Sequence, residues 1–358
     1  MQLGLLISGE SMFEKSFITD CEGPLTLNDN AYEISEVFIE NGGELFKILS
    51  LYDDYLADVV KKQNYKSGNT LKLILPFLVA ENLKNEDMVD FSKNNIFIVR
   101  DSKFLLKYLK EAMNIYIVST SYGQYIEAVS NYMGVDFENT FYTNVDVDDL
   151  KLNSSEIEKI NEFKKLILQN PKDYELFDDI FFSKIAQMEI YEKIKQINVV
   201  GGEGKKLAID EIVKRDNIDI SNSIYIGDSI TDVEPLDFVR KNNGLSISFN
   251  GNEYPLKVAE ISIVSPSAVT TALITDIYLK NDKTKVLKFI NDYNNSNDYE
   301  KLFNDYKIDE NINDEFFSIF TSDFPLIQII TDDNYENILK SSKQMRNNIR
   351  GHDIGELG

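Results

Sequence analysis

The stretch FITDCEGPLTLND, residues 17 to 29, places two acidic residues directly after a short apolar run. A continuous apolar run of this length predicts a buried strand, and the Gly and Pro that follow predict a turn. Asp20 and Glu22 would therefore lie where a strand ends and the chain turns. In open α/β sheets, ligands bind beyond the carboxyl ends of the strands, so both acids are candidate site residues.

Similar apolar runs recur along the chain, with segments of helical periodicity between many of them. Continuous apolar runs separated by helices indicate a mostly parallel sheet that is covered on both faces. We therefore expect an α/β protein with a three-layer, Rossmann-like core. The expected strands are residues 16–19, 96–99, 115–118, 197–200, 223–226, 245–249 and 261–264.

Three long stretches are helical in pattern, and the first two of them exceed what simple crossovers need. One of them, at about 150–195, opens with Ser155 and with Glu158 three positions later, which is a capping-box signal. These stretches predict a domain division. Residues 12–29 and 96–280 would form the α/β core with the insertion at about 150–195, residues 30–95 a helical cap, and residues 281–358 a C-terminal helical extension.

Composition narrows the classes of partner. The formal net charge of −23 argues against nucleic acid and anionic membrane surfaces, which are bound by clusters of Lys and Arg, and favours a metal cation. One cysteine and one histidine exclude a Cys/His zinc site. A single cysteine cannot form an internal disulfide, which is typical of proteins from reducing compartments. We therefore expect a cytoplasmic protein.

No segment predicts membrane insertion. The longest apolar stretch, LILPFLVA at 73–80, is much shorter than the roughly 20 residues that a spanning helix needs. The N-terminal LGLLIS lacks the positive flank of a signal peptide, and Met12 offers an alternative start of the chain.

Two further expected strands end on polar residues. Ser119 follows 115–118, with Thr120 and Ser121 as alternatives, and GDSITD at 227–232 follows 223–226. Its carboxylates, Asp228 and Asp232, suit a hard cation such as Mg²⁺. Upstream, GGEGKK at 201–206 opens a helix with Lys205, or alternatively Lys206, and both a lysine and a helix N-terminus favour phosphate.

Together these parts suit phosphoryl transfer, and their order resembles the haloacid dehalogenase (HAD) superfamily. The first motif of that family, D-x-D-G-T, resembles Asp20 to Pro24, and the second, a Ser or Thr that closes a strand, resembles Ser119. The third, a lysine that opens a helix, matches Lys205. The fourth, G-D-x-x-x-D, matches Gly227, Asp228 and Asp232.

The resemblance implies Mg²⁺-dependent hydrolysis of a small phosphomonoester. It implies that Asp20 is a nucleophile that forms an aspartyl-phosphate and that Glu22 is the acid and base. Mg²⁺ would be held by Asp20, Asp228 and the main-chain carbonyl of residue 22, with Asp232 assisting. Ser119 or its neighbour Thr120, together with Lys205, would bind the phosphoryl oxygens.

The sequence departs from the family pattern at two positions. Glu22 replaces the second Asp, which moves the carboxyl one methylene further out, and Pro24 replaces Thr. More narrowly, DCEGP followed by NDNA resembles a group of archaeal predicted phosphatases from methanogens that are named as a subunit of an energy-converting hydrogenase. The alternative to an enzyme is therefore a non-catalytic or regulatory subunit whose partners are hydrogenase subunits.

Overall fold

The structure is a computed structural model that describes residues 13–63, 65–355 and 357. The alternative start at Met12 lies outside the described residues. Within that part of the chain, no helix combines the length and the apolar character required to span a bilayer.

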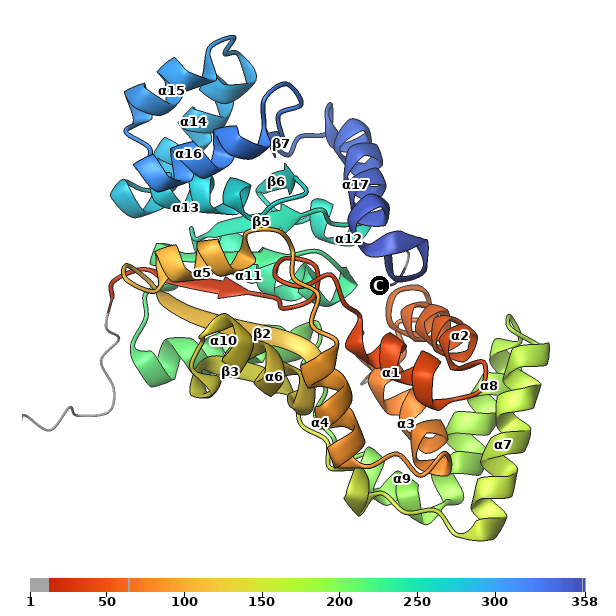
Figure 1. The fold of residues 1–358 in the computed structure, drawn as a ribbon. Coiled ribbons are helices and arrows are strands. Elements are labelled where there is room, and N and C mark those ends of the chain that lie inside the picture. Colours follow the sequence, from red (N-terminus) through yellow and green to blue (C-terminus); the bar gives the residue numbers. More distant parts are fainter. Residues whose placement is uncertain (1–12, 64, 356, 358) are drawn as a thin grey trace, which may run out of the picture.

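A seven-stranded sheet forms the centre of the molecule (Figure 1). Its strands are β1 (Ser16–Thr19), β2 (Asn114–Tyr122), β3 (Thr140–Thr143), β4 (Ser223–Gly227), β5 (Leu245–Phe249), β6 (Ile261–Val264) and β7 (Leu326–Ile329). They are ordered β3-β2-β1-β4-β5-β6-β7, and every neighbouring pair is parallel except β6 with β7. The first six strands thus have the order of a doubly wound sheet, which reverses between β1 and β4. The predicted mostly parallel α/β fold is confirmed.

Helices cover both faces of this sheet. On β1, Phe17 packs in one hydrophobic cluster with α5 (Ser102–Leu109), α6 (Gly123–Met133) and α13 (Val269–Lys280). Its neighbour Ile18 faces the other way, towards α10 (Glu203–Asp216) and α11 (Val233–Lys241). Because both faces are covered, every residue of the central strands β1, β4 and β5 is buried. The short α12 (Glu253–Leu256) lies between β5 and β6 in the chain.

Two of the expected strands are wrong, and β3 was not predicted. Residues 96–99 pair with the loop after β1 instead of joining the sheet: the Leu27 N–H donates to the Phe97 carbonyl at 2.7 Å, and Phe97 is 58% exposed. Residues 197–200 form a partly exposed connection. The edge strand β3 has half-buried central residues, so its sequence lacks the continuous apolar run that marks the central strands.

Two helical segments, far apart in the sequence, pack together beside the sheet (Figure 1). Side chains from both segments, such as Leu49 and Ile167, share one hydrophobic cluster. The first segment contains α1 (Asn30–Phe38), α2 (Gly42–Asp54), α3 (Thr70–Ala80) and α4 (Asn85–Asn94). The second contains α7 (Ser154–Gln169), α8 (Tyr174–Asp179) and α9 (Glu189–Ile194).

The cap of α7 lies two residues before the predicted one. Asn153, not Ser155, accepts a hydrogen bond from the Glu156 N–H at 3.0 Å, and Glu156 accepts one from the Asn153 N–H at 2.9 Å. Both pairs of residues fit the capping-box spacing, and Asn is as good an N-cap as Ser, so the sequence pattern alone did not distinguish them.

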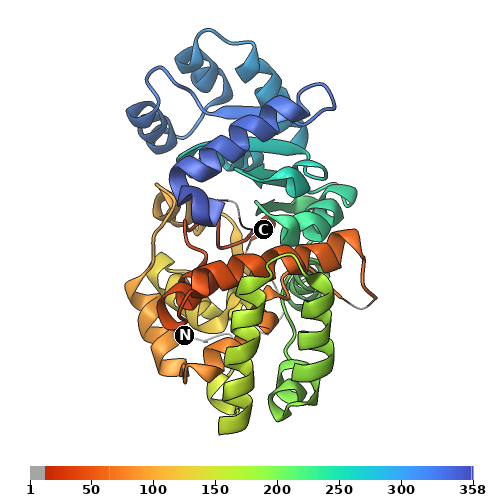
Figure 2. The same ribbon diagram turned by 90° about the vertical axis from the view of Figure 1, so that its right-hand side faces the viewer.

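The C-terminal part packs against the sheet and then returns to the strand ends. Helices α14 (Lys283–Asn294), α15 (Tyr299–Tyr306) and α16 (Glu310–Ile319) extend the cluster on the α13 face. Strand β7, which the helical pattern of this region did not predict, adds an antiparallel edge beside β6. Helix α17 (Tyr335–Gly355), with a non-helical turn at Gly351, then runs from β7 towards α2 (Figures 1 and 2).

Candidate active site

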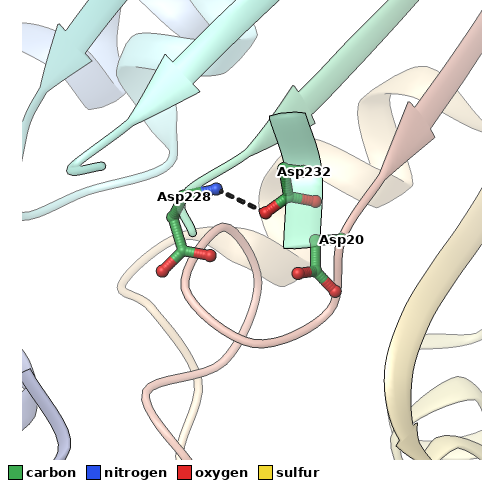
Figure 3. A group of neighbouring side chains, drawn as sticks. All are labelled: Asp20, Asp228 and Asp232. Carbon is green, nitrogen blue, oxygen red and sulfur yellow. Dashed lines mark hydrogen bonds between the residues drawn. The ribbon is translucent and has the colours of Figure 1, made fainter. Parts of the chain in front are cut away.

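Asp20 and Asp228 follow two neighbouring parallel strands. β1 pairs with β4 so that Thr19 lies opposite Ile226, and the Asp20 N–H continues the ladder by donating to the Ile226 carbonyl at 2.9 Å. Because the strand order reverses between β1 and β4, the connections diverge there and leave a crevice at the carboxyl ends. The fold thus brings two acids that are distant in the sequence to one crevice (Figure 3).

Gly23 allows the loop after β1 to pass close to Asp228. Its φ of +95° lies in a region that L-residues with a side chain avoid, and a Cβ at this position would lie 2.2 Å from the Asp228 Cγ. Gly227 has a similar steric role, since a Cβ there would lie 2.3 Å from the Asp232 Cγ. Each glycine therefore gives an aspartate the space in which it lies.

Lys205 links two of the acids. It lies in the first turn of α10, and its fully buried Nζ donates to Asp20 Oδ2 at 2.6 Å and to Asp232 Oδ1 at 2.7 Å. Burial alone would lower the pKa of Lys205, but the two carboxylates outweigh it and raise the pKa, so the ammonium stays charged. Lys206, the alternative, points away and pairs with Asp210 at 3.0 Å.

Asp232 organises the loop after β4. Its Oδ1 accepts from Lys205 and from the Tyr225 hydroxyl at 2.7 Å, and its Oδ2 accepts from the N–H groups of Asp228 and Ser229 at 3.0 Å each. Both oxygens are therefore occupied by donors within the protein (Figure 3 shows the bond from Asp228). This bonding favours an orienting role for Asp232.

The three aspartates are suited to a divalent cation. One carboxylate oxygen from each lies within 4.8 Å of the others, and all three residues are buried. Hard cations such as Mg²⁺ prefer such oxygen ligands. Each oxygen of Asp232 accepts from at least two donors, whereas Asp20 Oδ1 accepts from the Cys21 N–H and Asp20 Oδ2 from Lys205, and the donors to Asp228 converge on its Oδ2. Asp20 and Asp228 are therefore the better candidates for direct ligands. Burial, Asp232 and Asp228 raise the pKa of Asp20 to about 7 against the opposing effect of Lys205.

Strand β2 delivers three hydroxyls to the site. It continues to Tyr122, past the predicted end, so Ser119, Thr120 and Ser121 all line the cavity. The Ser119 hydroxyl donates to Ser121 Oγ at 3.3 Å, whereas the buried Thr120 Oγ1 has no hydrogen-bond partner among the residues that the structure describes. Buried polar groups are normally hydrogen-bonded, so the Thr120 hydroxyl is available to an oxygen of a ligand.

Glu22 lies half-buried at the same cavity. Its Oε1 accepts from the Asn30 N–H, at the start of α1, at 2.7 Å. Burial and the neighbouring Asp29 raise the pKa of Glu22 well above its ordinary value, despite the opposing effects of Asn30 and Arg350. A raised pKa favours the protonated carboxyl that a general acid needs.

The cavity between these groups has a volume of about 100 Å³. Strand ends form its floor, and the first helical segment contributes Asp53, Thr70 and Gly68 to its wall. Asp53 Oδ2 accepts from the Gly68 N–H at 2.9 Å and from the Thr70 hydroxyl at 3.0 Å. This buried acid therefore fixes the loop that closes over the strand ends.

Two arginines of α17 complete the cavity wall, and the sequence analysis missed both. Arg346 and Arg350 bind the same oxygen, Oδ2, of Asp228. The available signal was QMRNNIR at 344–350, where two of the five arginines of the chain lie four residues apart. In a helix this spacing places both on one face, which predicts a shared anionic partner without identifying it.

Comparison with solved structures finds similarity to a gene product of Archaeoglobus fulgidus, with a TM-score of 0.78 and 28% identity. The alignment covers 96% of this chain and 99% of that one, so it must include most of the C-terminal part.

More distant structural neighbours include a phosphoserine phosphatase and a HAD family hydrolase. A substrate-bound phosphoserine phosphatase has a TM-score of 0.49 at 16% identity and covers 76% of this chain and 100% of its own. A HAD family hydrolase of Salmonella enterica has a TM-score of 0.46 at 12% identity, with 69% and 66% coverage. No family model and no curated protein matches the sequence.

Proposed function

We propose that this protein is a Mg²⁺-dependent phosphohydrolase that acts on a small phosphomonoester. The observation that carries the proposal is the buried Lys205 between Asp20 and Asp232, beside Asp228 and at the point where the strand order reverses. Phosphoryl transfer is catalysed mainly by positioning and by positive charge around the transferring group. A buried lysine, a set of cation ligands and an unpaired hydroxyl around one small cavity provide these elements.

The residues fit Mg²⁺ as the cofactor. Asp20 and Asp228 would hold it with the main-chain carbonyl of Glu22, and Asp232 would orient Asp228 through the Asp228 N–H. When bound, Mg²⁺ supplies positive charge against the phosphoryl oxygens.

The side chains of the cavity suit a two-step reaction. Asp20, once ionised, attacks phosphorus; its oxygen forms a bond to phosphorus while the bond to the leaving alkoxide breaks. Glu22 donates its proton to the leaving oxygen, then removes a proton from the water that attacks phosphorus and releases phosphate. Lys205 and the hydroxyls of Ser119 and Thr120 donate to the phosphoryl oxygens throughout.

Turnover of a phosphomonoester panel with Mg²⁺ tests this proposal. Asp20→Asn should abolish turnover, and Glu22→Gln should lower it by roughly 10²- to 10⁴-fold, the usual range for a general acid. Asp210→Asn is the matched control, because this acid lies on α10 but pairs with Lys206 outside the cavity. It should leave turnover unchanged.

A folded protein that turns over none of these substrates would contradict the proposal. That result would favour the non-catalytic alternative, for which stable co-purification with hydrogenase subunits is the direct test. Equal activity of the wild type and Asp20→Asn would point to a contaminating phosphatase and would equally count against Asp20 as nucleophile.

A further inference from the structure

The C-terminal part of the chain forms a wall of the candidate active site. We call residues 346–355 the C-terminal strap. Helix α17 descends from the edge of the sheet to the strand ends, and its last turn lies near α2 of the first helical segment (Figures 1 and 2). Arg346 and Arg350 from the strap, together with Leu357 just beyond it, line the same cavity as Asp20 and Glu22.

Both arginines of the strap donate to Asp228, and Arg350 also donates to the main-chain carbonyls of Leu27 at 3.1 Å and Asn28 at 2.6 Å. Arg346 Nη1 donates to Asp228 Oδ2 and to its main-chain carbonyl, and Arg350 Nη1 donates to the same Oδ2 at 3.1 Å. The side chains are 3% and 5% exposed, and that of Asp228 is 2% exposed. Such buried, charge-assisted contacts are among the strongest that a carboxylate makes.

The charge balance at the three aspartates indicates that the strap arginines and a divalent cation are alternative partners of Asp228. Asp20, Asp228 and Asp232 can carry three negative charges, of which Lys205 balances one. The two guanidinium groups bring the two remaining positive charges. A divalent cation on Asp20 and Asp228 would bring the same two charges to the same carboxylate, and like charges at this spacing in a buried site repel strongly.

Arg346 also holds the end of the chain in place. Its Nε donates to the Gly355 carbonyl at 2.8 Å and its Nη2 to the Leu357 carbonyl at 2.9 Å. Leu357 packs in the hydrophobic cluster of the helical segments, and Asp353 pairs with Lys47 of α2. The strap is therefore fastened to the core and to the helical segments across the cavity, and Arg346 connects both attachments.

We propose that the C-terminal strap is an autoinhibitory element: Arg346 and Arg350 occupy Asp228 in the cation-free protein, and a divalent cation must displace them, which loosens the strap over the cavity. This inference rests on the cation site of the proposed function, but not on turnover. It predicts that cation binding and strap closure oppose each other, and coupling of this kind is reciprocal.

Calorimetric titration with Mg²⁺ tests the competition directly. Arg350→Gln and Arg346→Gln should each bind Mg²⁺ roughly tenfold more tightly than the wild type, within the usual range of coupling between sites. Lys343→Gln is the matched control, since Lys343 lies on the same helix but pairs with Glu253 away from the cavity. Its Mg²⁺ affinity should not change.

Hydrogen exchange of the wild-type protein gives a second readout that needs no variant. Saturating Mg²⁺ should speed the exchange of amides in residues 346–355, and Asp353→Asn, which removes the pair with Lys47 without touching Asp228, should do so without Mg²⁺. If Arg346→Gln fails to fold, the Mg²⁺ affinity of Arg350→Gln and the hydrogen exchange of the wild-type protein still test the proposal.

Equal or weaker Mg²⁺ binding by the folded arginine variants would overturn the proposal, and weaker binding would show that the arginines orient Asp228 for the cation. Slower exchange of the strap with Mg²⁺, or no Mg²⁺ binding by any variant, would also overturn it. Failure of turnover alone, with tighter Mg²⁺ binding by the variants, would instead contradict only the proposed function.

Discussion

Replacing Gly23 by Ala tests the geometry on which the site depends. The new Cβ would lie 2.2 Å from Asp228 Cγ and 2.3 Å from Asp228 Oδ2, well inside any van der Waals contact. Either the loop after β1 or the side chain of Asp228 must move. Asp228 is held by two arginines, so the displacement will be shared between the loop that carries the acids and the carboxylate itself.

The loss of folding stability in Gly23→Ala has two contributions. A left-handed residue with a side chain costs about 1–2 kcal/mol relative to Gly. Overpacking of a closely packed site adds about 1–3 kcal/mol. Gly23→Ala should therefore lower the free energy of unfolding by about 2–5 kcal/mol. A displacement of Asp228 or Asp20 by about 1 Å should also lower turnover by roughly 10²-fold, because reacting groups tolerate little misplacement.

Gly134→Ala separates the two parts. Gly134 also has a positive φ, +74°, but a Cβ there would meet no atom within 4 Å among the described residues beyond its two chain neighbours. This control should therefore show the backbone cost alone, with turnover and Mg²⁺ affinity unchanged. Urea denaturation, calorimetric titration with Mg²⁺ and phosphomonoester turnover should be measured for both variants. If Gly23→Ala loses no more stability than Gly134→Ala and keeps its Mg²⁺ affinity, the close approach of this loop to Asp228 is not needed by the site.

Three further predictions concern charge. Lys205→Met should lower the free energy of unfolding by about 3–5 kcal/mol, since it leaves buried carboxylates without their partner, whereas Lys206→Met should leave it nearly unchanged in the same urea titration. Burial raises the pKa of Asp53 to about 6 and that of Glu33 to about 7. The stabilisation from these groups is complete below their unfolded pKa values of about 4 and is lost as the pH rises through about 6 to 7. Without divalent cations, the Tm should thus fall between about pH 5 and pH 8, and Asp53→Asn should flatten this dependence; a Tm that rises over this range would contradict the assignment. Mg²⁺ at 100 times its Kd should stabilise the fold by about 2.7 kcal/mol in thermal unfolding, and Asp228→Asn should remove this effect.

The central strands could be predicted from the sequence because burial on both faces requires runs of apolar residues. Phe17 and Ile18 of β1 and residues 224–226 of β4 are apolar for that reason, and the acids after these strands follow from the rule that sites lie at carboxyl ends. The edge strand β3 is only partly buried and has Thr at both ends, so its apolar run is short. The other edge strand, β7, is apolar at 326, 327 and 329, but it lies in a region whose overall pattern is helical. Residues 96–99 form a continuous apolar run but do not join the sheet, because they pair with the loop after β1.

Residues of the candidate site could be predicted from the sequence only where they contact residues of the same short motif. Gly227, Asp228 and Asp232 interact within one turn, so their spacing is visible in the sequence. The contact of Arg346 with Asp228 depends on where α17 packs, and this helix follows Asp228 by more than a hundred residues. Nothing in the local pattern around either residue encodes that docking. The same holds for Asp53, whose partners lie across a loop of its own helical segment.

The position of β1 between β2 and β4 has a consequence for how the polypeptide is made. Chains leave the ribosome N-terminus first, so β1 emerges long before residues 223–226, with which it must pair. Until then one side of the central strand carries unpaired N–H and C=O groups, a state that invites contacts with other nascent chains. A product that stops before residue 223 can form many of the helices, yet it lacks β4, the strand that pairs with β1, and both Asp228 and Asp232 of the acidic cluster.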